Sequence, residues 1–501
     1  MGTLLVAATA AIAIALTGCG GGKKQDNAPA PGSAPAAAPA AAGVKDWTRF
    51  GYDAARTSHS PQGLTSSQVK RLREHRVRID GTADNSPVYL ARAQVGGHTR
   101  ELLVLTTTYG RTLGLDPSTG AVLWRFTPSS YSHVAGSAQI TTSTPVVDPN
   151  LRFLFAASPD GLIHKLRVSD GHEVTTGSWP ASVTRDATHE KIASALNIHG
   201  SSVLVTTGGY IGDAPPYQGK VLAIDRSSGK VTGVFNSLCS NRREIIQPSS
   251  CPTSDSAIWG RAGAVVDSAT NRIYVTSSNG PFNGLTDWSD SVLELSLAPS
   301  LLRHYTPPNE KVLAATDSDL GSTSPALLPD PSSSSSRAAY LLQGGKDRRL
   351  RLLSVGTSLH RVAGTAGRQL GGEVQSISVV GDSEMFTAPA VLHSKGLTEA
   401  FVATGGGTAA YRLAGGRLHE VWRNGNGGTS PVLAGGLLWV YDPAGALNVY
   451  RPGSGRLVRR LPAPPGHWNS PIVAGGRVYL PSGNANDHAT SGTLSIYRVS
   501  G

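Results

Sequence analysis

Short segments of alternating apolar and polar residues, separated by polar turns, recur along most of the chain. In the clearest copy, a Ser-Pro step at residues 86–87 is followed by an apolar run at 102–106, a turn at Gly110, a second run at 113–115 and an Asp-x-x-x-Gly turn that ends at Gly120. A period of two predicts half-buried β-strands, and the Asp- and Gly-rich breaks predict tight turns. The pattern therefore predicts an all-β protein.

A self-similar period of roughly 40 to 50 residues is typical of propeller blades, and looser copies of this unit follow one another at intervals of about 40 to 66 residues. Its copies start near Ser86, Thr144, Asn197, Gly263, Ser324, Ala388, Ser430 and Ser470. One such unit cannot bury its apolar face without neighbours, and closing the array into a ring removes exposed sheet edges. We therefore predict an eight-bladed β-propeller of four-stranded antiparallel blades over residues 45–501.

The N-terminal segment has a different character. An apolar run at residues 4–16 leads into Leu16-Thr17-Gly18-Cys19, although residues 1–18 contain no Lys or Arg. The run is short for a membrane span and is similar to a bacterial lipoprotein signal peptide with its lipobox. The resemblance implies removal of residues 1–18, lipidation of Cys19, and an extracytoplasmic chain anchored to the cell membrane or to an outer membrane. The alternative is a chance run of small residues before a buried cysteine.

Residues 19–44 are rich in Ala, Pro and Gly and predict a disordered tether. The whole chain has 45 Lys and Arg against 34 Asp and Glu, a formal net charge of +11. A basic surface favours an envelope protein or an anionic envelope polymer as partner, whereas nucleic acid is excluded outside the cell membrane. We expect a monomer that meets the membrane through its lipid anchor. Alternatively, the scattered basic residues only solvate the strand faces.

Two further cysteines, Cys239 and Cys251, flank a polar stretch within an insert at residues 237–256. In an oxidising compartment they predict a disulfide that stabilises the fold by about 2 to 3 kcal/mol; two buried free thiols are the alternative. The insert is longer than a hairpin turn, which indicates a partner contact or a lid over the central channel. The acidic stretch at 287–290 is read as an exposed loop or as a blade closure.

Three segments resemble the pyrroloquinoline quinone (PQQ) repeat propellers. They are a Trp-x-x-Phe-Gly-x-Asp-x-x-Arg-Thr segment at 47–57, a Leu-Asp-x-x-Thr-Gly-x-x-Leu-Trp segment at 115–124 and a Gly-Lys-Val-x-Ala-Ile-Asp-x-x-x-Gly segment at 219–229. The resemblance implies eight four-stranded blades, with a Trp and a Gly docking between neighbours. The family includes quinoprotein alcohol dehydrogenases, and also cofactor-free lipoproteins such as the propeller subunit of the outer-membrane barrel assembly machinery.

In the dehydrogenases of this family, the quinone and a Ca²⁺ ion lie over the ring axis. The resemblance implies that Asn279 and Asp317 are calcium ligands, that Asp317 or Asp319 is the catalytic base, and that Lys346 and Asp347 contact the quinone. Each residue also has a structural interpretation. Asn279 precedes a glycine in a turn, the two aspartates can bond their own turn backbones, and Lys346-Asp347 can be a solvated hairpin tip.

Several departures from the dehydrogenase pattern weigh against that chemistry. No two cysteines are adjacent, the family's Trp position falls near Gly263 with Trp259 four residues earlier, and only Asp213 lies where a Glu calcium ligand is expected. A haem attachment signature is missing as well. We therefore predict a lipid-anchored, cofactor-free propeller that acts as a non-catalytic binding or assembly scaffold at the cell envelope. The alternative is a PQQ- and Ca²⁺-dependent dehydrogenase that oxidises alcohols or sugars.

Overall fold

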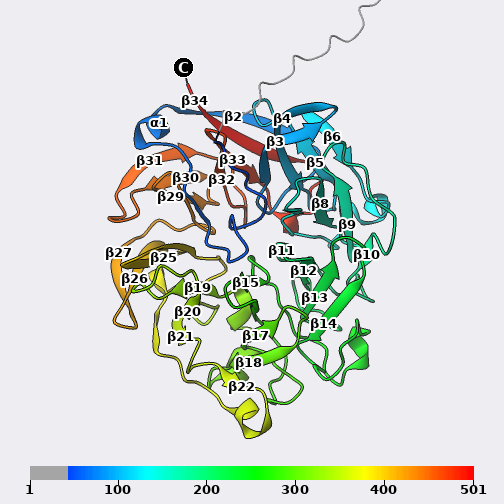
Figure 1. Ribbon diagram of the computed structural model, residues 1–501, viewed down its shortest axis with the longest axis vertical. Coiled ribbons are helices and arrows are strands. Elements are labelled where there is room, and N and C mark those ends of the chain that lie inside the picture. Colours follow the sequence, from blue (N-terminus) through cyan, green and yellow to red (C-terminus); the bar gives the residue numbers. More distant parts are fainter. Residues whose placement is uncertain (1–42, 501) are drawn as a thin grey trace, which may run out of the picture. The chain divides into compact units, whose positions relative to one another are not determined.

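Eight β-sheets form a ring in the computed structural model, which describes residues 43–500 (Figure 1). The predicted all-β, eight-bladed propeller of four-stranded antiparallel blades is confirmed. The predicted signal peptide at 1–18, the lipidated Cys19 and almost all of the tether at 19–44 lie outside the described residues, so these interpretations stay predictions.

We number the blades in chain order, and each blade runs from its innermost to its outermost strand. Blades 1 to 4 are β3 (Val88–Val95), β4 (His98–Thr106), β5 (Thr112–Leu115), β6 (Val122–Phe126); β7 (Val146–Val147), β8 (Phe153–Ala157), β9 (Leu162–Arg167), β10 (Ala181–Ser182); β11 (Asn197–His199), β12 (Ser202–Thr206), β13 (Lys220–Asp225), β14 (Val231–Asn236); and β15 (Val265–Asp267), β16 (Arg272–Thr276), β17 (Val292–Ser296), β18 (Leu301–Tyr305).

Blades 5 to 8 follow the same plan. They are β19 (Ala326–Pro329), β20 (Ala338–Gln343), β21 (Arg349–Ser354), β23 (Gln375–Ser378); β24 (Ala390–Ser394), β25 (Leu397–Thr404), β26 (Gly407–Ala414), β27 (Arg417–Asn424); β28 (Val432–Ala434), β29 (Leu437–Asp442), β30 (Ala446–Tyr450), β31 (Leu457–Pro462); and β32 (Ile472–Ala474), β33 (Arg477–Ser482), β34 (Gly492–Val499), β2 (Leu72–Ile79). Short additions are β1 (His59–Ser60) beside β28, β22 (His360–Arg361) beside β18, and the helices α1 (Ser66–Lys70), α2 (Tyr131–Val134) and α3 (Glu310–Ala315).

The predicted start of each repeat lies within two residues of the first residue of an innermost strand. Hydroxyl side chains at these steps link neighbouring blades: the Ser86 amide donates to Thr144 Oγ1 over 3.1 Å, and the Ala388 amide donates to Ser430 Oγ over 2.9 Å. The Ser-Pro and Thr-Pro pattern is therefore visible in the sequence because it serves the same inter-blade contact repeatedly.

The expected docking of tryptophan on glycine between blades is also present. A side chain at Gly171 in blade 2 would meet the ring of Trp124 from blade 1 at 2.4 Å, and one at Gly455 in blade 7 would meet Trp422 from blade 6 at 2.5 Å. Only glycine leaves room for the indole at these positions. In the closing blade, Val77 of β2 packs against a glycine of blade 1 in the same way.

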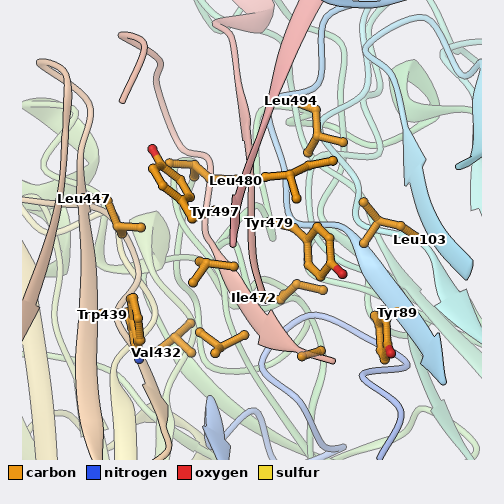
Figure 2. Packing of buried hydrophobic residues seen from close by; sticks show 14 of the residues in the cluster. Tyr89, Leu103, Val432, Trp439, Leu447, Ile472, Tyr479, Leu480, Leu494 and Tyr497 are labelled. Atoms are coloured by element: carbon orange, nitrogen blue, oxygen red, sulfur yellow. The ribbon is translucent and has the colours of Figure 1, made fainter. Parts of the chain in front are cut away.

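The ring is closed by a strand from the N-terminal part of the chain. β2 pairs with β34 in antiparallel register from Leu72 opposite Val499 to Ile79 opposite Gly492. A buried apolar cluster joins this closing blade to its two neighbours, with Tyr479 and Tyr497 of blade 8 between residues of blades 1 and 7 (Figure 2). This pairing supplies the outermost strand of the last blade and ties the two ends of the propeller together.

The segment at residues 47–58 crosses the centre of the ring. It exchanges backbone hydrogen bonds with the innermost strands of blades 1, 2, 4, 6 and 7, which surround the axis. Its buried Arg56 donates to the carbonyl oxygens of Phe50 over 2.6 Å and Leu196 over 2.9 Å. Each backbone contact with a blade is made at the second residue of its innermost strand. The segment therefore fills the central channel just below the connections that lead into those strands.

Candidate functional site

A cavity of about 760 Å³ lies above this central segment. It is lined by connections between successive blades and by the connections between the second and third strands of a blade. In a four-stranded antiparallel blade, these two kinds of connection lie on the same face of the ring. We call this hollow the central cavity. Because the rigid blades fix where each connection begins and ends, the residues that line the cavity are held in place by the fold.

Three of the predicted site residues meet on one wall of the central cavity. Lys346, between β20 and β21, places its Nζ 2.7 Å from Asp317 Oδ1 and 2.6 Å from Asp319 Oδ2. Asp319 is 2% exposed. Burial raises the pKa of Asp319 to about 7, although Lys346 acts in the opposite direction. The structure therefore brings these three residues together, and the solvated hairpin interpretation of Lys346 is wrong because its side chain is largely buried.

The other two predicted ligands turn away from that wall. The Asn279 amide donates to Tyr217 Oη over 3.0 Å, and Asn279 does not line the central cavity. Its φ of 56° fits the turn interpretation. Asp347 forms a buried ion pair with Arg351 inside blade 5 and accepts from the Arg349 amide over 3.2 Å. It is therefore neither a solvated tip nor part of the cavity wall.

Sequence reasoning missed an aromatic wall. Trp259, Phe386 and Trp468 come from the connections that lead into blades 4, 6 and 8. The ring centroids of Trp259 and Phe386 are 6.1 Å apart, and those of Phe386 and Trp468 are 4.8 Å apart. Trp259 lines the cavity although it lies four residues before the position expected for the family's tryptophan. The available signal was an aromatic residue a few positions before three of the eight repeat starts.

Two basic residues line another part of the central cavity. Arg261 donates from Nη2 to the Asp84 carbonyl oxygen over 2.5 Å and lies 3.8 Å from the Asp84 carboxylate. Asp84 also accepts from His467 Nδ1 over 2.7 Å, so this acid is fully engaged. Lys191, by contrast, makes no side-chain hydrogen bond and no ion pair with any residue in the range 43–500. Burial, together with the charge of Arg261, lowers the pKa of Lys191 to about 8.

Comparisons with known proteins agree with this architecture. A family model described as outer membrane protein assembly factor BamB matches residues 60–245. Quinohemoprotein alcohol dehydrogenase from Comamonas testosteroni superposes with a TM-score of 0.63 at 14% identity, covering 91% of this chain and 81% of that one. The resemblance to the PQQ-like repeat propellers is confirmed. No curated relative matches in a sequence comparison.

Two more solved PQQ-like propellers show how widely the fold is used. A europium-containing methanol dehydrogenase has a TM-score of 0.62 at 15% identity, covering 90% of this chain and 98% of that one. BamB from Moraxella catarrhalis has a TM-score of 0.50 at 14% identity, covering 85% and 97%. At such identities the likeness establishes the fold alone, because the same propeller carries unrelated functions.

The residues of this propeller do not fit a calcium-bound quinone. Within residues 43–500, no group of three or more His, Cys, Asp or Glu is arranged to hold a metal ion. The expected amide ligand, Asn279, is engaged with Tyr217 outside the cavity. The expected quinone contact, Lys346, is neutralised by two carboxylates. Of the donor set that the resemblance implied, Asp317 lines the central cavity together with Asp213, whereas Asn279 does not, so the amide ligand is missing from that wall.

The predicted disulfide between Cys239 and Cys251 is confirmed, and it lies in the connection between blades 3 and 4. The insert at 237–256 packs on the β16–β17 connection, where Trp288 Nε1 donates to Ser240 Oγ over 2.9 Å. None of its residues lines the central cavity. The prediction that 287–290 is an exposed loop is wrong: Trp288 and Asp290 are each 1% exposed, because the insert covers this stretch.

None of the helices within residues 43–500 is long and apolar enough to cross a membrane.

Proposed function

We propose that this protein is an exported, lipid-anchored propeller that binds a small aromatic anion in its central cavity and acts as a non-catalytic binding scaffold of the cell envelope. The observation that carries this proposal is Lys191. This lysine lines the same cavity as the aromatic wall and has no acidic partner among the described residues. A partly buried ammonium group without a protein partner has lost part of its hydration, and an anionic ligand would compensate for that loss.

The aromatic wall complements this cation. Trp259, Phe386 and Trp468 present three rings from different blades to the same hollow, and the framework fixes their spacing. Aromatic groups pack favourably on such rings in offset or tilted arrangements. A ligand that combines a carboxylate with a planar ring therefore satisfies Lys191 and the wall together. Concave sites that combine aromatic rings with convergent polar groups are typical of small-molecule binding.

The envelope part of the proposal follows from the chain outside and around the cavity. A lipid at Cys19 and the tether at 19–44 would hold the propeller near a membrane surface. The net charge of +11 favours an envelope protein or an anionic envelope polymer as partner of the outer surface. The likeness of residues 60–245 to the BamB family model supports a scaffold role by analogy of fold.

A PQQ- and Ca²⁺-dependent dehydrogenase that oxidises alcohols or sugars is the second candidate. It is favoured by the meeting of Asp317, Asp319 and Lys346 beside the Trp259 ring, which lies 5.6 Å from Lys346 Nζ. It ranks second because the calcium ligands implied by the resemblance do not converge, with Asn279 turned toward Tyr217. A buried carboxylate with a raised pKa is suited to proton transfer, but it also occurs in binding sites.

Calorimetric titration of the full chain with 2-naphthoate tests the binding proposal. We expect saturable binding that Lys191→Met weakens by about tenfold or more, because one charge-assisted contact is lost. Lys230→Met, which removes an exposed lysine of the same blade, is the matched control and should leave binding unchanged. The proposal is overturned if no saturable binding occurs at about 1 mM 2-naphthoate, or if the two variants behave alike.

A second experiment separates the two candidates. The full chain is incubated with PQQ and Ca²⁺, and dye-linked oxidation of alcohols and sugars is followed. We expect no turnover. Turnover that Asp319→Asn abolishes while Asp330→Asn, at an exposed acid of the same blade, retains it would establish the dehydrogenase instead.

A further inference from the structure

A second cavity, of about 430 Å³, lies on the same face of the ring and shares no lining residue with the central cavity. It is enclosed by the end of the insert before β15, by the β16–β17 connection and by helix α3. Two of these elements were singled out in the sequence, the disulfide-closed insert and the acidic stretch at 287–290, and neither takes part in the central cavity. We call this hollow the acidic cavity.

Three oxygen atoms in its wall have no hydrogen-bond partner among the described residues: Asp255 Oδ1, Ser289 Oγ and Asp290 Oδ2. Ser289 and Asp290 are each 1% exposed, so bulk water does not satisfy them. Buried polar oxygens are normally paired, and an unpaired one costs about 1 to 3 kcal/mol. Three such atoms around one hollow indicate that hydrogen-bond donors are supplied from outside the chain.

Two of these oxygens converge on one point. A Cβ atom built on Gly280 would lie 2.7 Å from Asp255 Oδ1 and 3.1 Å from Ser289 Oγ. Because Gly280 has no side chain, the space between the two oxygens stays open. A nitrogen with several N–H bonds in this region can therefore reach more than one acceptor at once.

The charges around the acidic cavity favour a cation. Asp255, Asp290 and the buried Glu310 line it, whereas Lys311 is its one basic residue among those described and is exposed. The other carboxylate oxygen of Asp290, Oδ1, accepts a hydrogen bond from the Leu320 amide over 3.0 Å, its one partner among the described residues. Burial raises the pKa of Asp290 to about 8, and the nearby negative charges of Asp319, Asp347 and Glu310 act in the same direction.

The remaining wall is apolar. Pro281, Phe282, Ala314 and Ala315 also line the hollow. The Phe282 ring is held by Trp288 at 5.8 Å and by His304 at 5.6 Å between ring centroids. A fixed aromatic ring next to carboxylates is a suitable environment for an organic ammonium ion. The ring and the carboxylates attract the positive charge of the ion, and its carbon atoms pack against the ring.

We propose that the acidic cavity binds a small primary ammonium compound, with its charged head at Asp255, Ser289 and Asp290 and its apolar tail along Phe282 and α3. An ammonium group supplies three donors and one positive charge, which favours the ionised form of Asp290 and then matches the three unpaired oxygens. A metal ion fits less well, since within residues 43–500 no three acidic or histidine ligands are close enough to share one. The inference does not depend on the function proposed for the central cavity.

Titration of the full chain with benzylammonium chloride, followed by calorimetry, tests this site. We expect saturable binding that Asp290→Asn weakens by about tenfold or more, because a charge-assisted hydrogen bond is lost while the amide still accepts from Leu320. Asp330→Asn, at an exposed acid, is the matched control and should bind like the parent protein. Lys191→Met should also leave this binding unchanged, which separates the two cavities.

Two further variants keep the test decisive. Asp255→Asn changes a less buried acid and should weaken binding even if Asp290→Asn fails to fold. Ser289→Ala removes one of the three unpaired oxygens and should also weaken binding. The proposal is overturned by the absence of saturable binding at about 1 mM benzylammonium, by binding that Asp255→Asn and Asp290→Asn both leave unchanged, or by Ca²⁺ binding at these carboxylates in place of the amine.

Discussion

Two neighbouring charged residues, one in the interior of blade 3 and one in the wall of the central cavity, differ in whether they have an ionic partner. Glu190 points into the blade, where it forms an ion pair with Lys220; both side chains are completely buried. Glu190 also accepts from the Gln218 amide over 2.9 Å and from the Thr184 hydroxyl. Lys191, the next residue, lines the central cavity without any acidic partner in the part of the chain that the structure describes.

The difference shows where this protein satisfies its polar groups and where it leaves them open. Inside blade 3, the buried charges of Glu190 and Lys220 are paired and hydrogen-bonded, as expected where their loss would destabilise the fold. On the cavity face, Lys191, one oxygen of Asp319 and one oxygen of Asp290 remain unpaired in the described structure. Unpaired buried groups that face a hollow are therefore the best indicators of ligand sites in this propeller.

The largest expected effect comes from breaking the paired side of this comparison. Lys220→Met leaves Glu190 buried without its partner, which should lower the free energy of unfolding by about 3 to 5 kcal/mol. Urea denaturation followed by circular dichroism measures it. The double variant Lys220→Met/Glu190→Met should recover much of the loss, because it removes the unpaired charge. Equal stability of Lys220→Met and the parent protein would contradict the assignment.

A smaller loss is expected from opening the insert. Replacing Cys239 and Cys251 by Ser removes a cross-link between residues 12 positions apart, which should cost about 2 to 3 kcal/mol through the greater freedom of the unfolded chain. Denaturation of the double variant measures this cost, with the parent protein under reducing conditions as the comparison. Binding of 2-naphthoate should persist, since the insert does not line the central cavity.

The next prediction concerns pH and tests the acidic cavity. The pKa of Asp290 is raised to about 8 in the folded protein, so the folded state keeps a proton that the unfolded state loses above about pH 4. The stability that this proton provides is complete below pH 4 and is lost as pH rises through about 8. Denaturation at pH 5 and at pH 8 should therefore show Asp290→Asn gaining stability relative to the parent protein as pH increases. A stability difference between Asp290→Asn and the parent protein that is the same at both pH values would contradict the raised pKa of Asp290.

The smallest effect is expected on the unpaired side of the comparison. Lys191→Met should change the free energy of unfolding by less than about 1 kcal/mol, or raise it slightly, because it removes a partly buried charge that has no partner. The same denaturation experiment applies, with Lys220→Met as the reference. If the two variants were equally destabilised, the distinction between framework and cavity charges would fail.

Short-range repetition in the sequence allowed much of the framework to be predicted. The starts of the eight blades are visible because Ser-Pro steps and alternating apolar residues repeat the same inter-blade contacts. The cysteine pair is visible because its partners are close in the chain. The meeting of Asp317, Asp319 and Lys346 could be expected from the family resemblance, since these residues follow recognisable repeat positions.

Other features have no local signature. The pairing of β2 with β34 joins segments more than 400 residues apart, and the central segment at 47–58 bonds to five blades at once. Composition and residue spacing predict neither that Lys191 has no ionic partner among the described residues nor that the Asn279 side chain bonds to Tyr217.

Sequence alone thus determined the repeated blade, the number of blades and the disulfide, because each depends on short-range alternation, turns and spacing. The closing strand, the aromatic wall and the two cavities were decided only by the tertiary structure. The physical reason is that a ring brings the connections of every blade to one face, so that residues distant in the chain become neighbours there. Which of their polar atoms find partners depends on that convergence and not on any local pattern.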